Sequence, residues 1–209
     1  MSCALSAIVL AGGQSRRFGQ DKRFLRLAGA NGPTLLEQTL NRVRGLCAEI
    51  VVVLNDPEQW SHLNATLVPD VYPTGGALGG IYSGLQALSA DYALVVGCDM
   101  PLLNPAVLRL MAEQPRSYDI LVPRSDHPTT TRNQLAAEPL HAIYGKPCLG
   151  PMQQALEAGQ RRIIDIFSTL RVTYLDPEQY RHLDPHGHTF LNVNTREQIA
   201  IAQAALGLQ

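Results

Sequence analysis

The stretch Ala7-Ile8-Val9-Leu10-Ala11-Gly12-Gly13-Gln14-Ser15-Arg16-Arg17-Phe18-Gly19-Gln20-Asp21-Lys22 joins a short apolar run to a basic, glycine-rich segment. An apolar run that ends at glycine predicts a buried strand over residues 7–10. Two adjacent glycines after a strand let backbone amides turn toward an anion, because no Cβ is in the way. Arg16, Arg17 and Lys22 add positive charge, and guanidinium groups match phosphate oxygens. The stretch therefore predicts a polyphosphate site after the first strand.

This stretch differs from two familiar phosphate-binding patterns. The pattern Gly-x-x-x-x-Gly-Lys-Ser/Thr requires a lysine after its second glycine, whereas Gln20 follows Gly19 here. The stretch does not match Gly-x-Gly-x-x-Gly either. A glycine-rich surface loop with solvated basic residues is the alternative interpretation. Three cations within seven positions after a buried strand favour the anion site.

The bulk composition restricts the class of protein. With 209 residues the chain fits one domain around one core. Its 17 Lys+Arg and 18 Asp+Glu give a net charge of −1, so no global basic field favours nucleic acid or an anionic membrane. The four cysteines form no Cys-x-x-Cys pair, which argues against a zinc or redox motif and predicts reduced thiols. We find no signal peptide or membrane helix, and therefore expect a cytoplasmic protein.

Apolar runs and helical periodicity divide the chain into alternating elements. A strand, a helix and a second buried strand at its start form a βαβ unit, which predicts a parallel sheet. We expect strands at 7–10, 50–54, 66–68, 92–97, 120–122, 139–144 and 171–175. We expect helices at 35–46, 57–63, 105–111, 151–158 and 163–170, and a last helix carrying Ile199, Ala202 and Leu206.

Two segments are expected to be loops. The glycine-rich block 75–84 predicts a loop that opens a helix close to a ligand, because a helix N-terminus carries unpaired N–H groups. A close-packed helix is the alternative for that block. The long polar stretch 123–137 predicts a mobile loop beside the site.

Asp99 follows the most apolar run of the chain, residues 92–97, which predicts a central strand. A carboxylate at the carboxyl end of such a strand lies in the crevice where parallel sheets bind ligands. Mg²⁺ prefers oxygen ligands and is held by one or two carboxylates together with substrate phosphates. Asp99 is therefore our candidate Mg²⁺ ligand, the alternative being an aspartate that caps the turn at Pro101.

Two motifs resemble the signatures of a known family. Leu-Ala-Gly-Gly-x-Ser-Arg-Arg-x-Gly-x-Asp-Lys over 10–22 and Phe-Leu-Asn-Val-Asn-Thr over 190–195 are similar to those of the molybdenum cofactor guanylyltransferases, within the MobA-like nucleotidyltransferases. Phe18 and Ala77 depart from the family, which has methionine and proline there. The resemblance implies an α/β fold, a three-layer Rossmann-like and mostly parallel sheet with helices on both faces. It implies one domain over 1–209, with a nucleotide-binding half at about 1–122 and an acceptor-binding half at about 123–209.

The same resemblance implies roles for individual residues. Lys22 and Arg16 would bind the β and γ phosphates and stabilise the departing pyrophosphate, so removing Lys22 should reduce the rate more than the binding. Asp99 would be catalytic as the Mg²⁺ ligand and would contact the nucleotide. The other nucleotide contacts would be Leu10, Ala11, Gly12, Gly13 and Asp70, with Asn55 a less certain neighbour.

The acceptor contacts implied by the resemblance lie in the second half of the chain. Arg161 and Arg162 are similar to a Gly-x-Arg-Arg segment of the family; the alternative is a basic, solvated start of a helix. Asn192 and Asn194 are the asparagines of the 190–195 motif. If that motif is a strand, its alternate positions face the same way, and both amides point into the cleft together.

The histidines give only weak evidence for a metal site. Asp184, His186 and His188 fall within five positions, but a His-x-His pair in a Pro/Gly loop is ordinarily polar surface, and nucleotidyl transfer needs no soft ligand. His127 and His141 have no partner at helical spacing. We therefore expect no histidine metal centre.

The leading hypothesis is transfer of GMP from GTP to the terminal phosphate of molybdenum-bound molybdopterin, which yields the guanine dinucleotide cofactor and pyrophosphate. The expected partners are thus GTP and a molybdopterin-type acceptor, with no nucleic acid and no membrane; the oligomeric state, a monomer included, stays open. A related transferase using CTP, or acting on a sugar or alditol phosphate, is the first alternative. The second is a non-catalytic nucleotide-binding chaperone of the cofactor, which would be expected to have lost Asp99 or Lys22.

Overall fold

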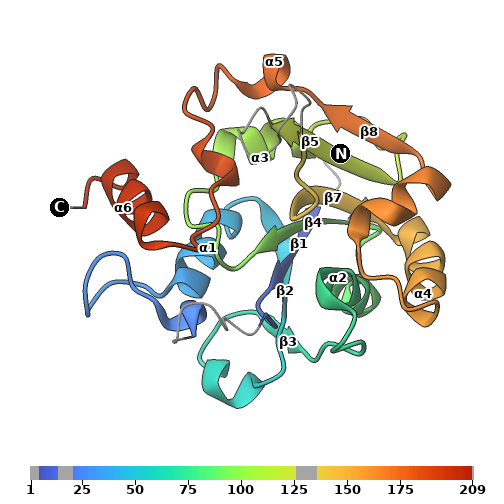
Figure 1. Ribbon diagram of the computed structural model, residues 1–209, viewed down its shortest axis with the longest axis horizontal. Helices are drawn as coiled ribbons and strands as arrows, with labels where there is room; N and C mark the ends of the chain where they lie inside the picture. The colour runs from blue at the N-terminus through green and yellow to red at the C-terminus, as the bar shows by residue number, and fades with distance from the viewer. Residues whose placement is uncertain (1–4, 14–20, 126–135, 209) are drawn as a thin grey trace.

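A central sheet organises the molecule, as Figure 1 shows for the computed structural model, which describes residues 5–13, 21–125 and 136–208. Eight strands of the described residues belong to this sheet. The strands are β1 (Leu5–Leu10), β2 (Cys47–Val53), β3 (Thr66–Val68), β4 (Tyr92–Gly97), β5 (Ile120–Ser125), β6 (Ala136–Ala137), β7 (His141–Gly145) and β8 (Val172–Leu175). The α-helices are α1 (Leu35–Val43), α2 (Gly76–Ala87), α3 (Pro105–Ala112), α4 (Leu149–Glu157), α5 (Pro177–Tyr180) and α6 (Arg196–Ala205).

The strand order is β3-β2-β1-β4-β7-β5-β6, and β8 pairs with β5. The first four strands in this order run parallel, whereas β7 is antiparallel to both of its neighbours, β4 and β5. The register pairs Leu10 of β1 with Val53 of β2 and with Gly97 of β4, so the three strands end at the same level. The loops that follow these strands therefore meet at one edge of the sheet.

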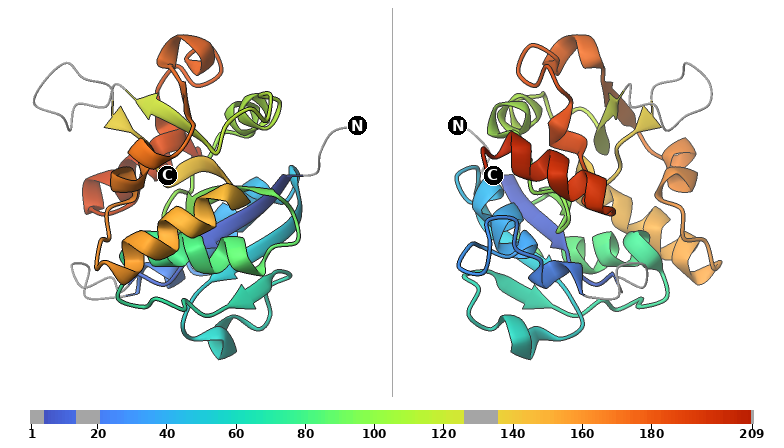
Figure 2. Two further views of the ribbon diagram at one scale, coloured as in Figure 1. Left: turned by 90° about the vertical axis from the view of Figure 1, so that its right-hand side faces the viewer. Right: turned by 60° about the vertical axis from the view of Figure 1, so that its left-hand side comes forward.

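Helices cover both faces of the sheet, because apolar side chains alternate between the faces of each buried strand. On one face, β1 residues such as Ala7 and Val9 pack with α1 and α3. On the other face, Ile8 packs with α2 and α4, which Figure 2 shows side by side. The predicted α/β fold, with a mostly parallel core and helices on both faces, is confirmed.

The glycine-rich block 75–84 was expected to be a loop, and this prediction is wrong, because α2 begins at Gly76. A Cβ on Gly84 would lie 2.5 Å from Cγ2 of Ile8, and one on Gly80 would lie 3.0 Å from Cδ2 of Leu10. Without side chains at these positions, α2 packs closely against β1. The burial of its apolar residues outweighs the low helix propensity of glycine.

Four other segments differ from the sequence expectations. The expected helix 57–63 is the short 3-10 helix η2 (Pro57–Trp60). Residues 163–170 form a 3-10 helix, η4 (Ile163–Thr169), in place of an α-helix. The motif 190–195 is not a strand: it follows the 3-10 helix η5 (His188–Phe190) and crosses to the loop after β4, where the Val193 amide donates to the Asp99 carbonyl at 2.9 Å. In the expected loop 123–137, β5 extends to Ser125 and β6 forms at its end, while residues 126–135 lie outside the described residues.

The two expected halves of the chain contribute to the same sheet, because β7 of the second half lies between β4 and β5 of the first. At the C-terminus, α6 packs beside the segment before α1, with Ala202 and Leu27 in one small apolar cluster (Figure 2). Across the described ranges, we find no helix with the length and apolar character needed to span a bilayer.

Candidate active site

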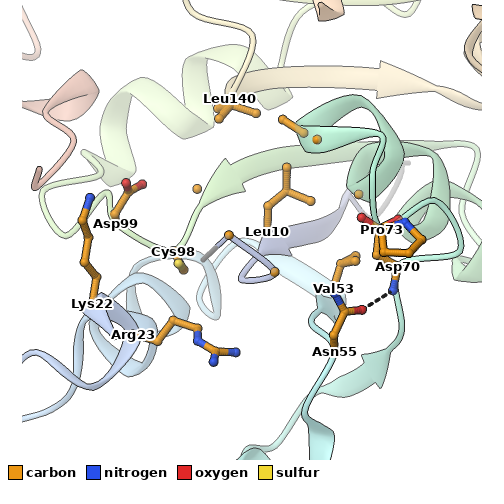
Figure 3. A pocket seen from close by; sticks show the side chains of 16 residues that line it. Leu10, Lys22, Arg23, Val53, Asn55, Asp70, Pro73, Cys98, Asp99 and Leu140 are labelled. Carbon is orange, nitrogen blue, oxygen red and sulfur yellow. Dashed lines mark hydrogen bonds between the residues drawn. The ribbon is translucent and has the colours of Figure 1, made fainter. Parts of the chain in front are cut away.

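A cavity of about 620 Å³ opens at the carboxyl ends of the parallel strands (Figure 3). Its walls come from the segments after β1, β2, β3 and β4 and from the start of α2. The strand order reverses direction at β1, since β2 lies on one side of it and β4 on the other. Open parallel sheets bind ligands at such a point, in the crevice outside the strand ends.

The residues directly after β1 line this cavity. The Ala11 amide donates to the Val53 carbonyl at 2.8 Å, and the Cys98 amide donates to the Leu10 carbonyl at 3.0 Å, so the chain is fixed as it leaves the sheet. Ala11 is buried, whereas Gly12 and Gly13 are exposed and line the cavity with Leu10. Arg16 and Arg17 lie outside the described residues.

Lys22 and Asp99 lie together at one end of the cavity, where Figure 3 shows the Lys22 amine and the Asp99 carboxylate pointing toward each other. Lys22 begins the 3-10 helix η1 (Lys22–Phe24), whose N-terminus is capped by the side chain of Asp21. Its amine also donates to Oδ1 of Asn194, which is 172 positions away in the sequence. Segments that are distant in sequence thus supply a cation, a carboxylate and an amide to one place.

The carboxylate of Asp99 occupies a space left by a glycine. A Cβ on Gly97 would lie 2.7 Å from Oδ1 of Asp99, so the carboxylate could not keep this position beside any other residue. Burial raises the pKa of Asp99 above its ordinary value, although the positive charge of Lys22 acts in the opposite direction. A half-buried carboxylate of this kind gains from a cation that replaces its lost hydration.

Asp70 and Asn55 line the opposite end of the cavity (Figure 3). The Asp70 amide donates to Oδ1 of Asn55 at 3.1 Å. Oδ1 of Asp70 accepts hydrogen bonds from the Tyr72 amide at 2.9 Å and from the hydroxyl of Ser83 in α2 at 3.0 Å. Asn55, whose register was uncertain from the sequence, is therefore a neighbour of Asp70 in the fold.

The four candidate acceptor residues are not brought together. Asn194 contacts Lys22, whereas the side-chain Nδ2 of Asn192 donates to the Phe190 carbonyl at 3.3 Å. The side chain of Arg162 is 73% exposed and lies 3.9 Å from a carboxylate oxygen of Asp165. Arg161 is exposed too, and neither arginine lines the cavity. The acceptor roles of these residues, like the nucleotide and metal roles given above, stay predictions.

Comparison with known proteins identifies the family of a chain with this sheet and this cavity. Residues 7–190 match the model of the MobA-like NTP transferase domain. The chain belongs to this family. A probable molybdenum cofactor guanylyltransferase of Chloroflexus aggregans is 44% identical to it over 204 residues, which cover 97% of this chain and 95% of that protein. The molybdenum cofactor guanylyltransferase of Desulfosudis oleivorans is 32% identical over 204 residues, which cover 97% and 96%.

A solved structure of the family shares the fold. The molybdopterin-guanine dinucleotide biosynthesis protein A of Archaeoglobus fulgidus superposes with a TM-score of 0.80 at 26% sequence identity. The match covers 97% of this chain and 99% of that one. The arrangement of strands and helices described above is therefore that of a MobA-like NTP transferase throughout its length.

The sequence did not lead us to predict one residue that lines the cavity of this MobA-like transferase domain. Arg23 lines the cavity, but its guanidinium is bound by Asp21 and Asp56. Among the described residues, Arg23 is the arginine that pairs with Asp21. The available signals were the Asp-Lys-Arg triplet after the glycine segment and an aspartate after the second strand.

His186 and His188 lie beside each other in the fold, and His141 lies in the core. The rings of His186 and His188 stack with centroids 5.3 Å apart, and Oδ2 of Asp184 accepts a hydrogen bond from the Thr189 amide at 2.8 Å. Within the residues that the structure describes, no three His, Cys, Asp or Glu side chains gather as a metal site. His141 is fully buried against Phe190, away from solvent.

Proposed function

We propose that this protein transfers GMP from GTP to the terminal phosphate of molybdenum-bound molybdopterin and releases pyrophosphate. The observation that carries the proposal is the convergence of Lys22, Asp99 and Asn194 beside the glycine segment, at the strand ends of a MobA-like transferase domain. The choice of guanine as the base and of molybdopterin as the acceptor rests on relatives that are named molybdenum cofactor guanylyltransferases.

The reaction requires alignment and charge neutralisation more than covalent work by side chains. An oxygen of the acceptor's terminal phosphate attacks the α-phosphorus of GTP, and the bond from that phosphorus to the bridging oxygen of the β-phosphate breaks. Negative charge then grows on the departing pyrophosphate. We assign the binding of these phosphates to the exposed backbone at Gly12 and Gly13 and to the amine of Lys22, all of which line the cavity, with Arg16 assisting.

Asp99 is proposed to hold Mg²⁺, and its surroundings fit such an ion. The donor is an oxygen, the glycine at position 97 lets the carboxylate take its place at the cavity, and burial disfavours its charge without a counterion. When bound, Mg²⁺ would supply positive charge to the phosphate oxygens. Lys22, on the same side of the cavity, adds a second positive charge to that region.

The nucleoside is proposed to lie toward the other end of the cavity. Backbone groups of Leu10, Ala11 and Gly12 and the carboxylate of Asp70 would contact it. The hydrogen bonds of Asp70 to Tyr72 and Ser83 fix that carboxylate before a ligand arrives, which limits the entropy lost on binding.

The acceptor is proposed to approach from the C-terminal segment, since Asn194 already lies against Lys22. Asn192 would contribute from the same segment. Arg161 and Arg162 are proposed to meet the part of the acceptor that extends beyond the cavity, where two exposed guanidinium groups suit an anionic ligand.

The test is pyrophosphate release by the purified protein with Mg²⁺. We expect release from GTP only when molybdenum-bound molybdopterin is supplied, and no release from CTP under the same conditions. Release from CTP instead would overturn the base assignment. Release from no triphosphate, with GTP still raising the melting temperature, would favour the non-catalytic chaperone, because a ligand at 100 times its Kd stabilises the native state by about 2.7 kcal/mol.

A further inference from the structure

Arg23 makes an unusual set of contacts for a residue in a phosphate-binding region. Its side chain is 13% exposed. Its Nε donates to Oδ2 of Asp21 at 2.9 Å, its Nη2 donates to Oδ2 of Asp56 at 2.7 Å, and its Nη1 donates to the Ala11 carbonyl at 3.2 Å. One guanidinium thus binds two carboxylates and a backbone oxygen.

These three partners occupy key positions in the chain. Ala11 comes directly after β1, where the glycine segment begins, and Asp21 lies where that segment ends, directly before Lys22. Asp56 belongs to the neighbouring loop after β2. Arg23 therefore joins both ends of the segment 11–21 to a third point on the sheet edge.

The charge of Arg23 is already balanced by protein groups. Burial raises the pKa of Asp21, but hydrogen bonds and charge from Arg23 more than offset this, so the pKa of Asp21 lies below its ordinary value. The hydrogen bonds that Arg23 donates to both aspartates likewise raise the pKa of Arg23 despite its burial. Figure 3 shows the Arg23 side chain turned away from the end of the cavity where Lys22 meets Asp99.

An aromatic side chain supports this cluster. Cζ of Arg23 lies 5.7 Å from the ring centroid of Trp60, which is 1% exposed. The ring of Phe24 stacks on the same indole, with centroids 4.5 Å apart. These contacts with Trp60 hold the turn that carries Lys22 against the rest of the protein.

We propose that Arg23 is a positioning residue for the triphosphate: by clamping both ends of the segment 11–21 to Asp56, it fixes the backbone of Gly12 and Gly13 and the origin of Lys22. The inference rests on the proposed function, since it assigns these groups to the phosphates of GTP. Arginine is required because only its planar fork can bind two carboxylates and a carbonyl at once.

The test compares three variants of the full chain. Arg23→Lys keeps the charge but loses the fork, and Asp56→Asn keeps Arg23 but removes its anchor. Arg171→Lys is the matched control, because Arg171 forms a similar two-bond pair with Asp119, at 3.2 and 2.7 Å, remote from the cavity. GTP and guanosine binding are measured by calorimetry, and amide hydrogen exchange of residues 21–25 is followed without nucleotide.

We expect Arg23→Lys and Asp56→Asn each to weaken GTP binding about tenfold. Guanosine, which lacks phosphates, should lose far less affinity than GTP in both variants, and exchange over 21–25 should be faster in both variants. The control should match the wild type in every measurement.

Tighter GTP binding by Asp56→Asn would overturn the inference, because it would mean that the freed guanidinium binds phosphate directly. Unchanged GTP binding by Arg23→Lys would also overturn it, and would leave the proposed function intact. Absence of GTP binding by the wild type would overturn the proposed function itself, together with this inference.

Discussion

The buried carboxylate of Asp99 lowers the stability of the folded protein, and in the proposed function the same carboxylate holds Mg²⁺. Its carboxylate lies at the end of the central strand β4, in a space that exists only because residue 97 is glycine. Burial raises its pKa, which means that the folded protein disfavours the charged form. For an acid with a raised pKa, this cost appears as the pH rises through that pKa and is absent below the unfolded value.

Asp99→Asn should therefore abolish turnover without loss of stability. Asparagine keeps the shape but has no charge to desolvate and is a poor Mg²⁺ ligand. We expect the melting temperature at pH 7 to stay equal or to rise by a few degrees, given about 2–4 °C per kcal/mol for a chain of this size. Differential scanning calorimetry and pyrophosphate release measure the two properties.

The control is Asp91→Asn, at an exposed residue before β4, which should change neither property. Turnover of Asp99→Asn close to that of the wild type would remove Asp99 from the metal site. A large fall in its melting temperature would contradict the account of its pKa.

At the scale of elements, α2 determines the shape of the cavity. Its glycines let the helix lie close to β1, so that its first turn and Ser83, which binds Asp70, reach the strand ends. The same block of glycines looked like a loop in the sequence. Packing of its apolar side chains and glycines against β1 explains why this block is a helix.

Gly84→Ala should destabilise the protein. The new Cβ would lie 2.5 Å from Cγ2 of Ile8, which is fully buried, and β1 would have to move away from α2. Overpacking of this kind costs about 1–3 kcal/mol. Urea unfolding would measure the change in the free energy of unfolding.

Gly150→Ala provides the comparison, because Gly150 lies in α4 and a Cβ there would meet nothing within 4 Å. That variant should be as stable as the wild type or more stable by about 0.5–1 kcal/mol, owing to the helix propensity of alanine. Equal stability of the two variants would show that α2 tolerates a wider spacing from β1.

At the scale of the whole molecule, His141 links the sheet to the C-terminal region. It lies on β7, pairs with Val96 of the central strand, and its ring contacts Phe190 of η5 with centroids 4.8 Å apart. Burial lowers the pKa of His141 to about 3. The unfolded chain takes up this proton near the ordinary pKa of about 6.5, so the folded state loses stability as the pH falls between these two values.

His141→Leu should make the protein less sensitive to acid. Between pH 7 and pH 5, the wild type should lose about 2 kcal/mol more in free energy of unfolding than the variant. Urea unfolding at the two pH values gives both differences, with the exposed His182→Gln as the control that should follow the wild type. Equal losses in all three proteins would show that His141 does not control the acid stability.

Local structure follows from short-range chemistry, and this part of the protein could be predicted from the sequence. Unbroken apolar runs predicted the central strands, and the glycines and cations after residue 10 indicated a phosphate segment. Asp99 was placed at a strand end because Pro101 follows it and an apolar run precedes it. These predictions depend on neighbours a few positions apart, and the sequence contains that information directly.

Which distant residues meet could not be predicted from the sequence, because it depends on the tertiary fold. The contact of Lys22 with Asn194, the clamp of Arg23 on Asp56 and the antiparallel insertion of β7 depend on how strands pair across the sheet. The helix over the 75–84 glycines could not be predicted either, because its close packing against Ile8 is a contact between distant residues. Hydrophobic burial is non-directional, so a sequence shows which residues become buried but not which elements they pack against.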